Sequence, residues 1–105
     1  MDNSKKSSFE MLVGLNVIND LEYQKYREGM MPILKNYKGE FGYDFKVSEV
    51  LKSETDNNIN RVFTIRFSDK DNMDAFFANE DYIKVKERYF KGSVESTTII
   101  ASYFI

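Results

Sequence analysis

Apolar and polar residues alternate in several short stretches of the chain, and alternation with a period of two is typical of β-strands. Every odd position over residues 9–17 is apolar. The alternation returns over residues 61–67, and over residues 40–51 with one polar face. Residues 96–105 are β-branched and aromatic on both faces, which predicts a strand covered on both sides. The pattern therefore predicts four strands, with residues 40–51 as an edge strand that has a bulge near Glu49.

A helix is predicted between the first two strands. Asn19 is placed to cap its first turn, and Glu22 three residues later completes a capping box. Its apolar residues recur at intervals of three and four, which puts them on one face: Tyr23, Tyr26, Met30, Ile33 and Tyr37. Gly29 and Pro32 interrupt the helix, but the apolar spacing keeps its phase, so we expect a kink near Gly29 rather than a break. Gly39 is expected to end the helix in the left-handed conformation.

A second helical region is predicted between the third and fourth strands. Acceptor and acidic side chains stand at its start: Ser68, Asp69 and Asp71. The residues after them form an apolar face: Met73, Phe76 and Phe77. Asn79 can cap a continuation over residues 82–90, in which four residues line up: Tyr82, Val85, Lys86 and Tyr89. Residues 53–60 are polar turn formers and predict a hairpin loop.

The element order βαββαβ predicts an α+β fold of the ferredoxin-like class, with a four-stranded antiparallel sheet and two helices on one face. We expect a single domain over residues 9–105, preceded by a disordered tail over residues 1–8. The sheet face without helices carries mostly apolar or small residues: Leu12, Gly14, Val62, Thr64, Ile100 and Phe104. Because this face is too apolar for water in so small a protein, we expect a homodimer that buries sheet against sheet.

Composition excludes several classes of function. With 42% hydrophobic residues, the chain is too apolar to be intrinsically disordered. Its net charge of −2 gives no electrostatic attraction to nucleic acid or to an anionic membrane surface. The absence of Cys and His excludes thiolate and imidazole metal sites and a Ser-His-Asp triad. No apolar run has the length of a membrane span or the form of a signal peptide, so we expect a cytoplasmic protein.

Two further patterns fit known binding sites poorly. Residues 69–74 carry carboxylates of the kind that bind calcium, but Met73 and Asp74 stand where a calcium loop needs an oxygen donor and a glycine. These acids are better explained as the start of a helix. RNA-recognition modules share the element order, yet residues 60–67 lack the glycine that their third strand carries. We therefore expect no metal site and no nucleic-acid partner.

Several segments carry a family resemblance: Asp20, residues 23–26 (YQKY), Gly39, residues 61–67 (RVFTIRF), residues 75–77 (AFF) and residues 80–82 (EDY). With these, the chain from residue 9 to its end resembles the domain of unknown function 1330 family within the dimeric α+β-barrel superfamily. The resemblance implies two protomers whose sheets face each other in a barrel. It also implies a pocket between the helices and the sheet of each protomer.

Relatives in that superfamily include cofactor-independent quinol-type monooxygenases and haem-degrading monooxygenases. The haem-degrading proteins use an Asn on the first strand together with a Trp and a His. This chain has Asn16 but neither of the others, which argues against haem chemistry. The usual Gly-Gly after the first helix appears here as Lys38-Gly39.

Two groups of residues are candidates for binding a ligand. Five tyrosines could orient a phenol or quinone by stacking and a hydrogen bond, although aromatic residues at helical spacing are commonly core: Tyr23, Tyr26, Tyr43, Tyr82 and Tyr89. Asn16 and Arg66 are polar residues on the even face of two adjacent central strands and need partners there. They are expected to pair with each other, to line the dimer seam or to bind an anionic ligand, and the seam is favoured.

The sequence thus predicts a homodimer that holds a small aromatic or apolar molecule in an aromatic-lined pocket, without a metal or prosthetic group. The ligand-binding candidates are Asn16, Tyr23, Tyr26, Arg66, Phe77 and Tyr82. A cofactor-independent monooxygenase or isomerase is one alternative, in which the protein supplies a dry cavity and positioning. A non-enzymatic structural or sensing dimer is the other.

Overall fold

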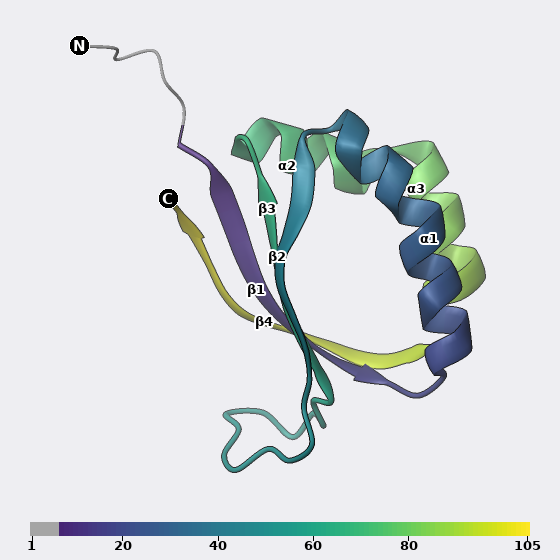
Figure 1. The fold of residues 1–105 in the computed structure, drawn as a ribbon, viewed down its shortest axis with the longest axis vertical. Coiled ribbons are helices and arrows are strands. Elements are labelled where there is room, and N and C mark those ends of the chain that lie inside the picture. The colour runs from purple at the N-terminus through teal and green to yellow at the C-terminus, as the bar shows by residue number, and fades with distance from the viewer. Residues whose placement is uncertain (1–6) are drawn as a thin grey trace.

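A computed structural model describes residues 7–105 as one curved sheet with all its helices on one face (Figure 1). The elements follow in the order β1 (Phe9–Val17), α1 (Asp20–Asn36), β2 (Gly39–Lys46), β3 (Arg61–Phe67), α2 (Lys70–Ala78), α3 (Glu80–Val85), a π-helical turn η1 (Lys86–Phe90) and β4 (Val94–Phe104). The strands are antiparallel in the order β2-β3-β1-β4. The predicted ferredoxin-like sheet is confirmed, with β2 at one edge.

The predictions for β2 are wrong in two respects. The strand ends at Lys46, and residues 47–60 form the loop to β3. Its bulge lies between Phe41 and Asp44 instead of near Glu49. The hydroxyl of Thr64 explains this position, because its Oγ1 accepts the backbone N–H of Tyr43 at 2.8 Å and so takes the place of a backbone acceptor. Beyond the bulge, Asp44 pairs with a helix-facing position of β3.

The turn after α1 also differs from the prediction. α1 runs unbroken through Gly29 and Pro32. Lys38, with a φ of 57°, adopts the left-handed conformation expected of Gly39. Gly39 is required for another reason, because a Cβ there would collide with Leu34 and come within 2.8 Å of the Phe67 ring. The glycine therefore allows the first residue of β2 to lie directly against the core.

The core lies between the helices and the helix-facing side of the sheet. Its buried side chains come from every helix and from three strands: Val13, Leu15, Val17, Tyr23, Tyr26, Met30, Leu34, Phe63, Ile65, Phe67, Phe76, Tyr82 and Val94. α1 and α3 approach closely at Gly29, where an added Cβ would lie 3.0 Å from Val85. Among residues 7–105, no helix is long and apolar enough to cross a membrane.

The outer face of the sheet is partly covered by the chain itself. Ile59, from the loop before β3, lies over Gly14. A Cβ added to Gly14 would be 3.0 Å from the Ile59 side chain. Tyr43 and Phe45 stack on each other, with ring centroids 5.7 Å apart, and stay 67% and 54% exposed. This face therefore keeps an exposed aromatic patch at its β2 edge.

The prediction that β4 is covered on both sides is wrong for the chain alone. β4 is the second edge strand, and Ile99 and Ile100 are 52% and 48% exposed. A register shift between Leu12 and Val13 places Phe104 opposite Phe9, so Phe104 belongs to the helix-facing side and not to the outer face as predicted. Of the expected tail, residues 1–6 lie outside the described residues. Ser8 exchanges two backbone hydrogen bonds with Ile105.

Candidate ligand-binding cavity

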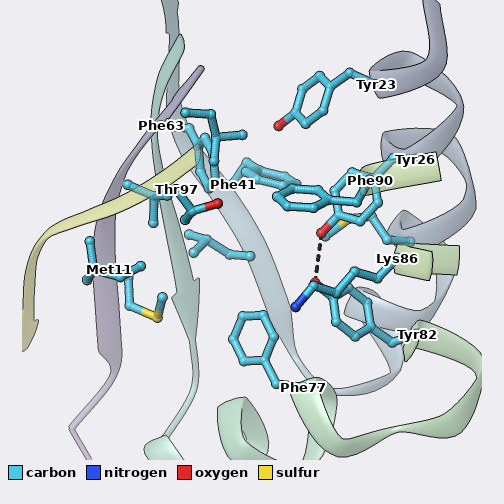
Figure 2. Close-up of a pocket in the computed structure, with 15 residues that line it drawn as sticks. Met11, Tyr23, Tyr26, Phe41, Phe63, Phe77, Tyr82, Lys86, Phe90 and Thr97 are labelled. Carbon is cyan, nitrogen blue, oxygen red and sulfur yellow. Dashed lines mark hydrogen bonds between the residues drawn. The ribbon is translucent and has the colours of Figure 1, made fainter. Parts of the chain in front are cut away.

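A cavity of about 210 Å³ lies between the sheet and the helices (Figure 2). Its strand side is formed by Met11, Val13, Leu15, Phe41, Phe63, Ile65, Thr97 and Ile99. Its helix side is formed by Tyr23, Tyr26, Met30, Phe77, Tyr82, Lys86 and Phe90. Ile99 and Lys86 are exposed, so the cavity meets solvent between β4 and η1. Most of the wall is aliphatic or aromatic, and the polar atoms are few.

Two buried tyrosines join their hydroxyl groups on the helix side. The hydroxyl oxygens of Tyr26 and Tyr82 lie 2.9 Å apart, and their side chains are 6% and 4% exposed. Local structure fixes Tyr82, because the side chain of Asn79 caps α3 by accepting the Tyr82 backbone N–H at 2.9 Å. The Phe76 ring supports the Tyr82 ring at a centroid distance of 4.4 Å. The pair therefore links α1 to α3 at a defined point of the cavity wall.

Both hydroxyls of this pair stay protonated. Burial, which disfavours a phenolate, raises the pKa of Tyr26 and also that of Tyr82. Two protonated hydroxyls carry two hydrogens, and their mutual hydrogen bond uses one of them. The pair thus has one O–H donor beyond its own bond.

A charged cluster supports the other end of the cavity around Tyr23. The Tyr23 hydroxyl accepts a hydrogen bond from Arg27 Nε at 2.8 Å, and burial still raises the pKa of Tyr23. The Arg27 guanidinium lies 3.9 Å from the centroid of the Phe41 ring, on which it stacks. The Asp44 carboxylate lies 3.3 Å from Arg27 Nη1, and its two oxygens accept hydrogen bonds from Nε and Nη2 of Arg61 at 2.8 and 2.9 Å. The bulge in β2 makes this cluster, because it turns Asp44 toward α1.

The π-helical turn η1 decides which residues of the last helical segment reach the cavity. Its backbone closes with a hydrogen bond from Lys91 N to Lys86 O at 3.2 Å. The extra residue in this turn brings Phe90 into the wall, 4.8 Å from Tyr26 between ring centroids. Tyr89, predicted to share a face with Tyr82, packs against the core outside the cavity wall. Lys86 lines the cavity from the start of the same turn.

Four of the six predicted ligand-binding residues line this cavity: Tyr23, Tyr26, Phe77 and Tyr82. Of the other tyrosines considered, Tyr43 lies on the outer face and Tyr89 behind the wall. The sequence analysis missed Phe41, Lys86, Phe90, Thr97 and Ile99 as lining residues. The four-residue spacing of Tyr82 and Lys86 was the available signal for Lys86.

Asn16 and Arg66 lie on the outer face, away from the cavity and from each other. The Asn16 amide donates to Glu95 Oε1 at 3.1 Å, and its oxygen accepts from Asn58 and Asn60 at 3.4 Å. Arg66 Nε lies 3.5 Å from Oε1 of Glu10, its cross-strand neighbour. The pairing of Asn16 with Arg66, one of the predicted alternatives, is therefore wrong. Each residue has partners at its own end of β1.

No cluster of three or more acidic side chains, in the part of the chain that the structure describes, is arranged to hold a metal ion. The acidic residues at the start of α2 instead serve the helix, since Asp69 caps it by accepting the Asn72 backbone N–H at 2.8 Å. The functional groups of the cavity wall are therefore aromatic rings, hydroxyl groups and the Lys86 ammonium group.

The model of a family described as Domain of unknown function (DUF1330) matches residues 11–103. No curated protein matches the chain. Among solved structures, a Rhodopseudomonas palustris protein of unknown function, RPA0582, has a TM-score of 0.79 at 13% identity, with 93% of this chain and 82% of that chain covered. A dimeric Bacteroides fragilis protein of unknown function with a ferredoxin-like fold gives 0.60 at 12% identity, with 93% and 96% covered. SnoaB, a cofactor-independent oxygenase from Streptomyces nogalater, gives 0.59 at 10% identity, with 94% and 91% covered.

Proposed function

The chain belongs to the family Domain of unknown function (DUF1330), and we propose that it binds a small aromatic or apolar molecule in the cavity between its helices and its sheet. One observation carries this proposal. A folded protein of this size closes most of its interior at crystal-like density, and a void is costly because its lining loses contacts. A cavity of about 210 Å³ that opens to solvent and is lined mainly by apolar side chains is best explained by an occupant.

The volume limits the size of that occupant. An apolar cavity of about 150 Å³ is enough to bind benzene. The cavity here is about 210 Å³, which suits one aromatic ring with one or two small substituents. Pockets for drug-sized molecules begin at about 300 Å³. The proposed ligand is therefore a monocyclic compound.

A homodimer is part of the proposal. The exposed aromatic pair Tyr43 and Phe45 on the outer face, and Ile100 on the edge strand β4, give a second copy apolar surface to cover. The Bacteroides fragilis neighbour of the same fold is dimeric. Light scattering after size-exclusion chromatography is expected to give the mass of two chains. A single particle of 12.4 kDa at micromolar concentration would refute the dimer.

Oxygenation without a cofactor is the second candidate function, and the similarity of the fold to SnoaB favours it. In such a reaction the protein contributes a dry cavity and positions the substrate. Oxygen consumption in the presence of a ligand that binds distinguishes this function from simple binding or sensing. Binding without oxygen consumption would reject the oxygenase.

Thermal shift measurements test the proposed binding. We expect catechol, hydroquinone, toluene or benzoate to raise the melting temperature, since a ligand at a hundredfold excess over its Kd adds about 2.7 kcal/mol to the stability. Thr97→Phe places a ring in the cavity mouth and is expected to remove the shift. Thr98→Phe, on the outer face of the same strand, is the matched control and is expected to keep it. No shift with any of these compounds would reject the proposal and favour a purely structural dimer.

A further inference from the structure

The helix side of the cavity combines hydrogen-bond donors with a positive charge. The Tyr26 and Tyr82 hydroxyls meet there, and Lys86 follows Tyr82 by one helical turn (Figure 2). Figure 2 shows the Lys86 side chain extending into the cavity from η1, on the same side as the two hydroxyls. The opposite wall, made by β1 and β3, is entirely apolar. Tyr23 and Thr97 add single hydroxyls elsewhere in the wall, but only the side near η1 joins two hydroxyls to a positive charge among the described lining residues.

The hydroxyl pair has a hydrogen that it can donate to a ligand atom. One of its two hydrogens is used in the 2.9 Å bond between the hydroxyls, and the second has no other acceptor among the described residues. An O–H group buried in an apolar wall favours a ligand atom that can accept its hydrogen. The pair therefore offers a hydrogen-bond donor to an oxygen acceptor on the ligand.

Charge favours an anionic acceptor over a neutral one. Lys86 is the only charged residue in the described cavity wall, and no acidic side chain faces it there. Lys86 also forms no ion pair within residues 7–105. Hydrogen bonds in which one partner is charged are about twice as strong as neutral ones. An ammonium without a carboxylate partner thus offers a site for a negative oxygen.

We infer that the cavity is specific for a monocyclic aromatic compound that carries one anionic oxygen, as a phenolate or carboxylate, bound by Lys86 and the Tyr26–Tyr82 hydroxyl pair. The ring would lie against the apolar strand side, and the oxygen would point toward η1. This inference rests on the proposed function, because it names the chemistry of the ligand for the same cavity. It gives Lys86 the role of a specificity-determining residue.

The other titratable groups near the cavity do not supply a competing anion or cation. On α1, the Tyr23 hydroxyl is held by Arg27, and Arg27 lies behind the Phe41 ring. Asp44, on β2, is bound by Arg27 and Arg61. β1 and β3 contribute apolar side chains to the wall, and β4 contributes Thr97 and Ile99. A pH effect on ligand binding is thus expected to come from the titration of the ligand.

Binding of para-nitrophenol, compared with para-nitrotoluene as its neutral analogue, tests this inference on the full chain. The yellow phenolate reports its own protonation state by absorbance. We expect the pKa of bound para-nitrophenol to fall by about one unit, which corresponds to about tenfold tighter binding of the phenolate than of the phenol. Lys86→Met is expected to remove most of this shift and to leave para-nitrotoluene binding unchanged.

Two further variants keep the test independent of folding. Lys84→Met removes the same charge from the exposed side of α3, outside the cavity wall, and is expected to behave as wild type. The double variant Tyr26→Phe/Tyr82→Phe removes both hydroxyls together, which leaves no buried hydroxyl without a partner and preserves the fold. It is expected to bind para-nitrotoluene as well as wild type and para-nitrophenolate several-fold more weakly.

The outcomes separate this inference from the proposed function. Binding of both compounds with an unchanged or raised pKa of para-nitrophenol would overturn the inference and leave the proposed function standing. An equal loss of the pKa shift in Lys84→Met and Lys86→Met would also overturn it, because a general effect of charge would then explain the shift. Failure of both compounds to bind would reject the proposed function and the inference together.

Discussion

Polar and aromatic side chains differ in burial and hydrogen bonding between the two faces of the sheet. On the helix-facing side, most aromatic rings are buried, and the Tyr26–Tyr82 pair has a hydrogen-bond donor beyond its own bond. On the outer face, the aromatic pair Tyr43 and Phe45 is exposed, and polar groups bind one another, as Tyr103 does when it donates to Glu10 at 2.5 Å. The inner face thus has the apolar wall and the free hydrogen-bond donor on which the proposed ligand binding rests. The outer face is built to satisfy its own polar groups and to offer an apolar surface.

Aromatic truncation gives the largest expected difference between the faces. Phe76 is fully buried and contacts the rings of Phe67 and Tyr82, so Phe76→Ala is expected to lower the free energy of unfolding by about 3–5 kcal/mol. Phe45→Ala removes a ring that is 54% exposed in the single chain, so its contacts within the chain are expected to contribute less than about 1 kcal/mol. Urea unfolding measures both. A comparable loss for Phe45→Ala would show that the outer face is as buried as the inner one, as in a tight dimer.

Adding a single methyl group probes the packing of the two faces. In Gly39→Ala, the new Cβ meets Leu34 and the Phe67 ring in the core, and overpacking of this kind costs about 1–3 kcal/mol. In Gly14→Ala, the Cβ meets only the side chain of Ile59, which belongs to an exposed loop and can move aside. We expect a loss of stability in urea unfolding for the first variant and a change below about 0.5 kcal/mol for the second. The reverse order would contradict the assignment of the core side.

The ion cluster beside the cavity gives a pH-dependent difference. Hydrogen bonds from Arg61 hold the pKa of Asp44 below its ordinary value of 3.8. A lowered carboxyl pKa stabilises the fold above the unfolded value, and this stabilisation is lost as the pH falls through the folded value. Asp44→Asn is expected to cost about 1 kcal/mol near neutral pH, because solvent screens part of the interaction.

Unfolding curves of the wild type and of Asp44→Asn, measured at neutral pH and below pH 3.8, test this. The difference between the two proteins is expected to shrink in the acidic range. Asp74→Asn, which disrupts an exposed pair with Lys70 on α2, is the control and is expected to change little at either pH. A difference that stays constant with pH would mean that the charge of Asp44 contributes nothing to stability.

The sequence predicted the sheet and the inward-facing side of the tyrosines well, because the signals for both are local. Alternation and helical spacing depend on a few neighbouring residues, and they identified β1, β3, α1 and the inward faces that carry Tyr23, Tyr26 and Tyr82. The order of the elements predicted the ferredoxin-like sheet, and the helix-covered face was inferred only from the alternation.

The errors came from contacts between distant segments. The bulge in β2 lies where the Thr64 hydroxyl accepts a backbone N–H. Gly39 is needed because it packs directly against Leu34 and Phe67, and the left-handed conformation is adopted by Lys38 instead. The π-helical turn brought Phe90 into the cavity in place of Tyr89, and a spacing rule for α-helices does not predict an inserted residue. These features require three-dimensional proximity, which a single sequence does not display.

Arg66 gives the smallest expected effect and tests the separation of the two faces most directly. Its side chain is 40% exposed, and the distance of 3.5 Å from its Nε to Oε1 of Glu10 is that of a weak ion pair. Arg66→Ala is therefore expected to cost less than about 1 kcal/mol in urea unfolding and to leave para-nitrophenolate binding at the wild-type level. Weaker binding, as in Lys86→Met, would place the outer face within the ligand site. Dissociation of the dimer with unchanged para-nitrophenolate binding would instead assign Arg66 to the dimer interface. Ligand binding in the cavity would then not depend on the outer face.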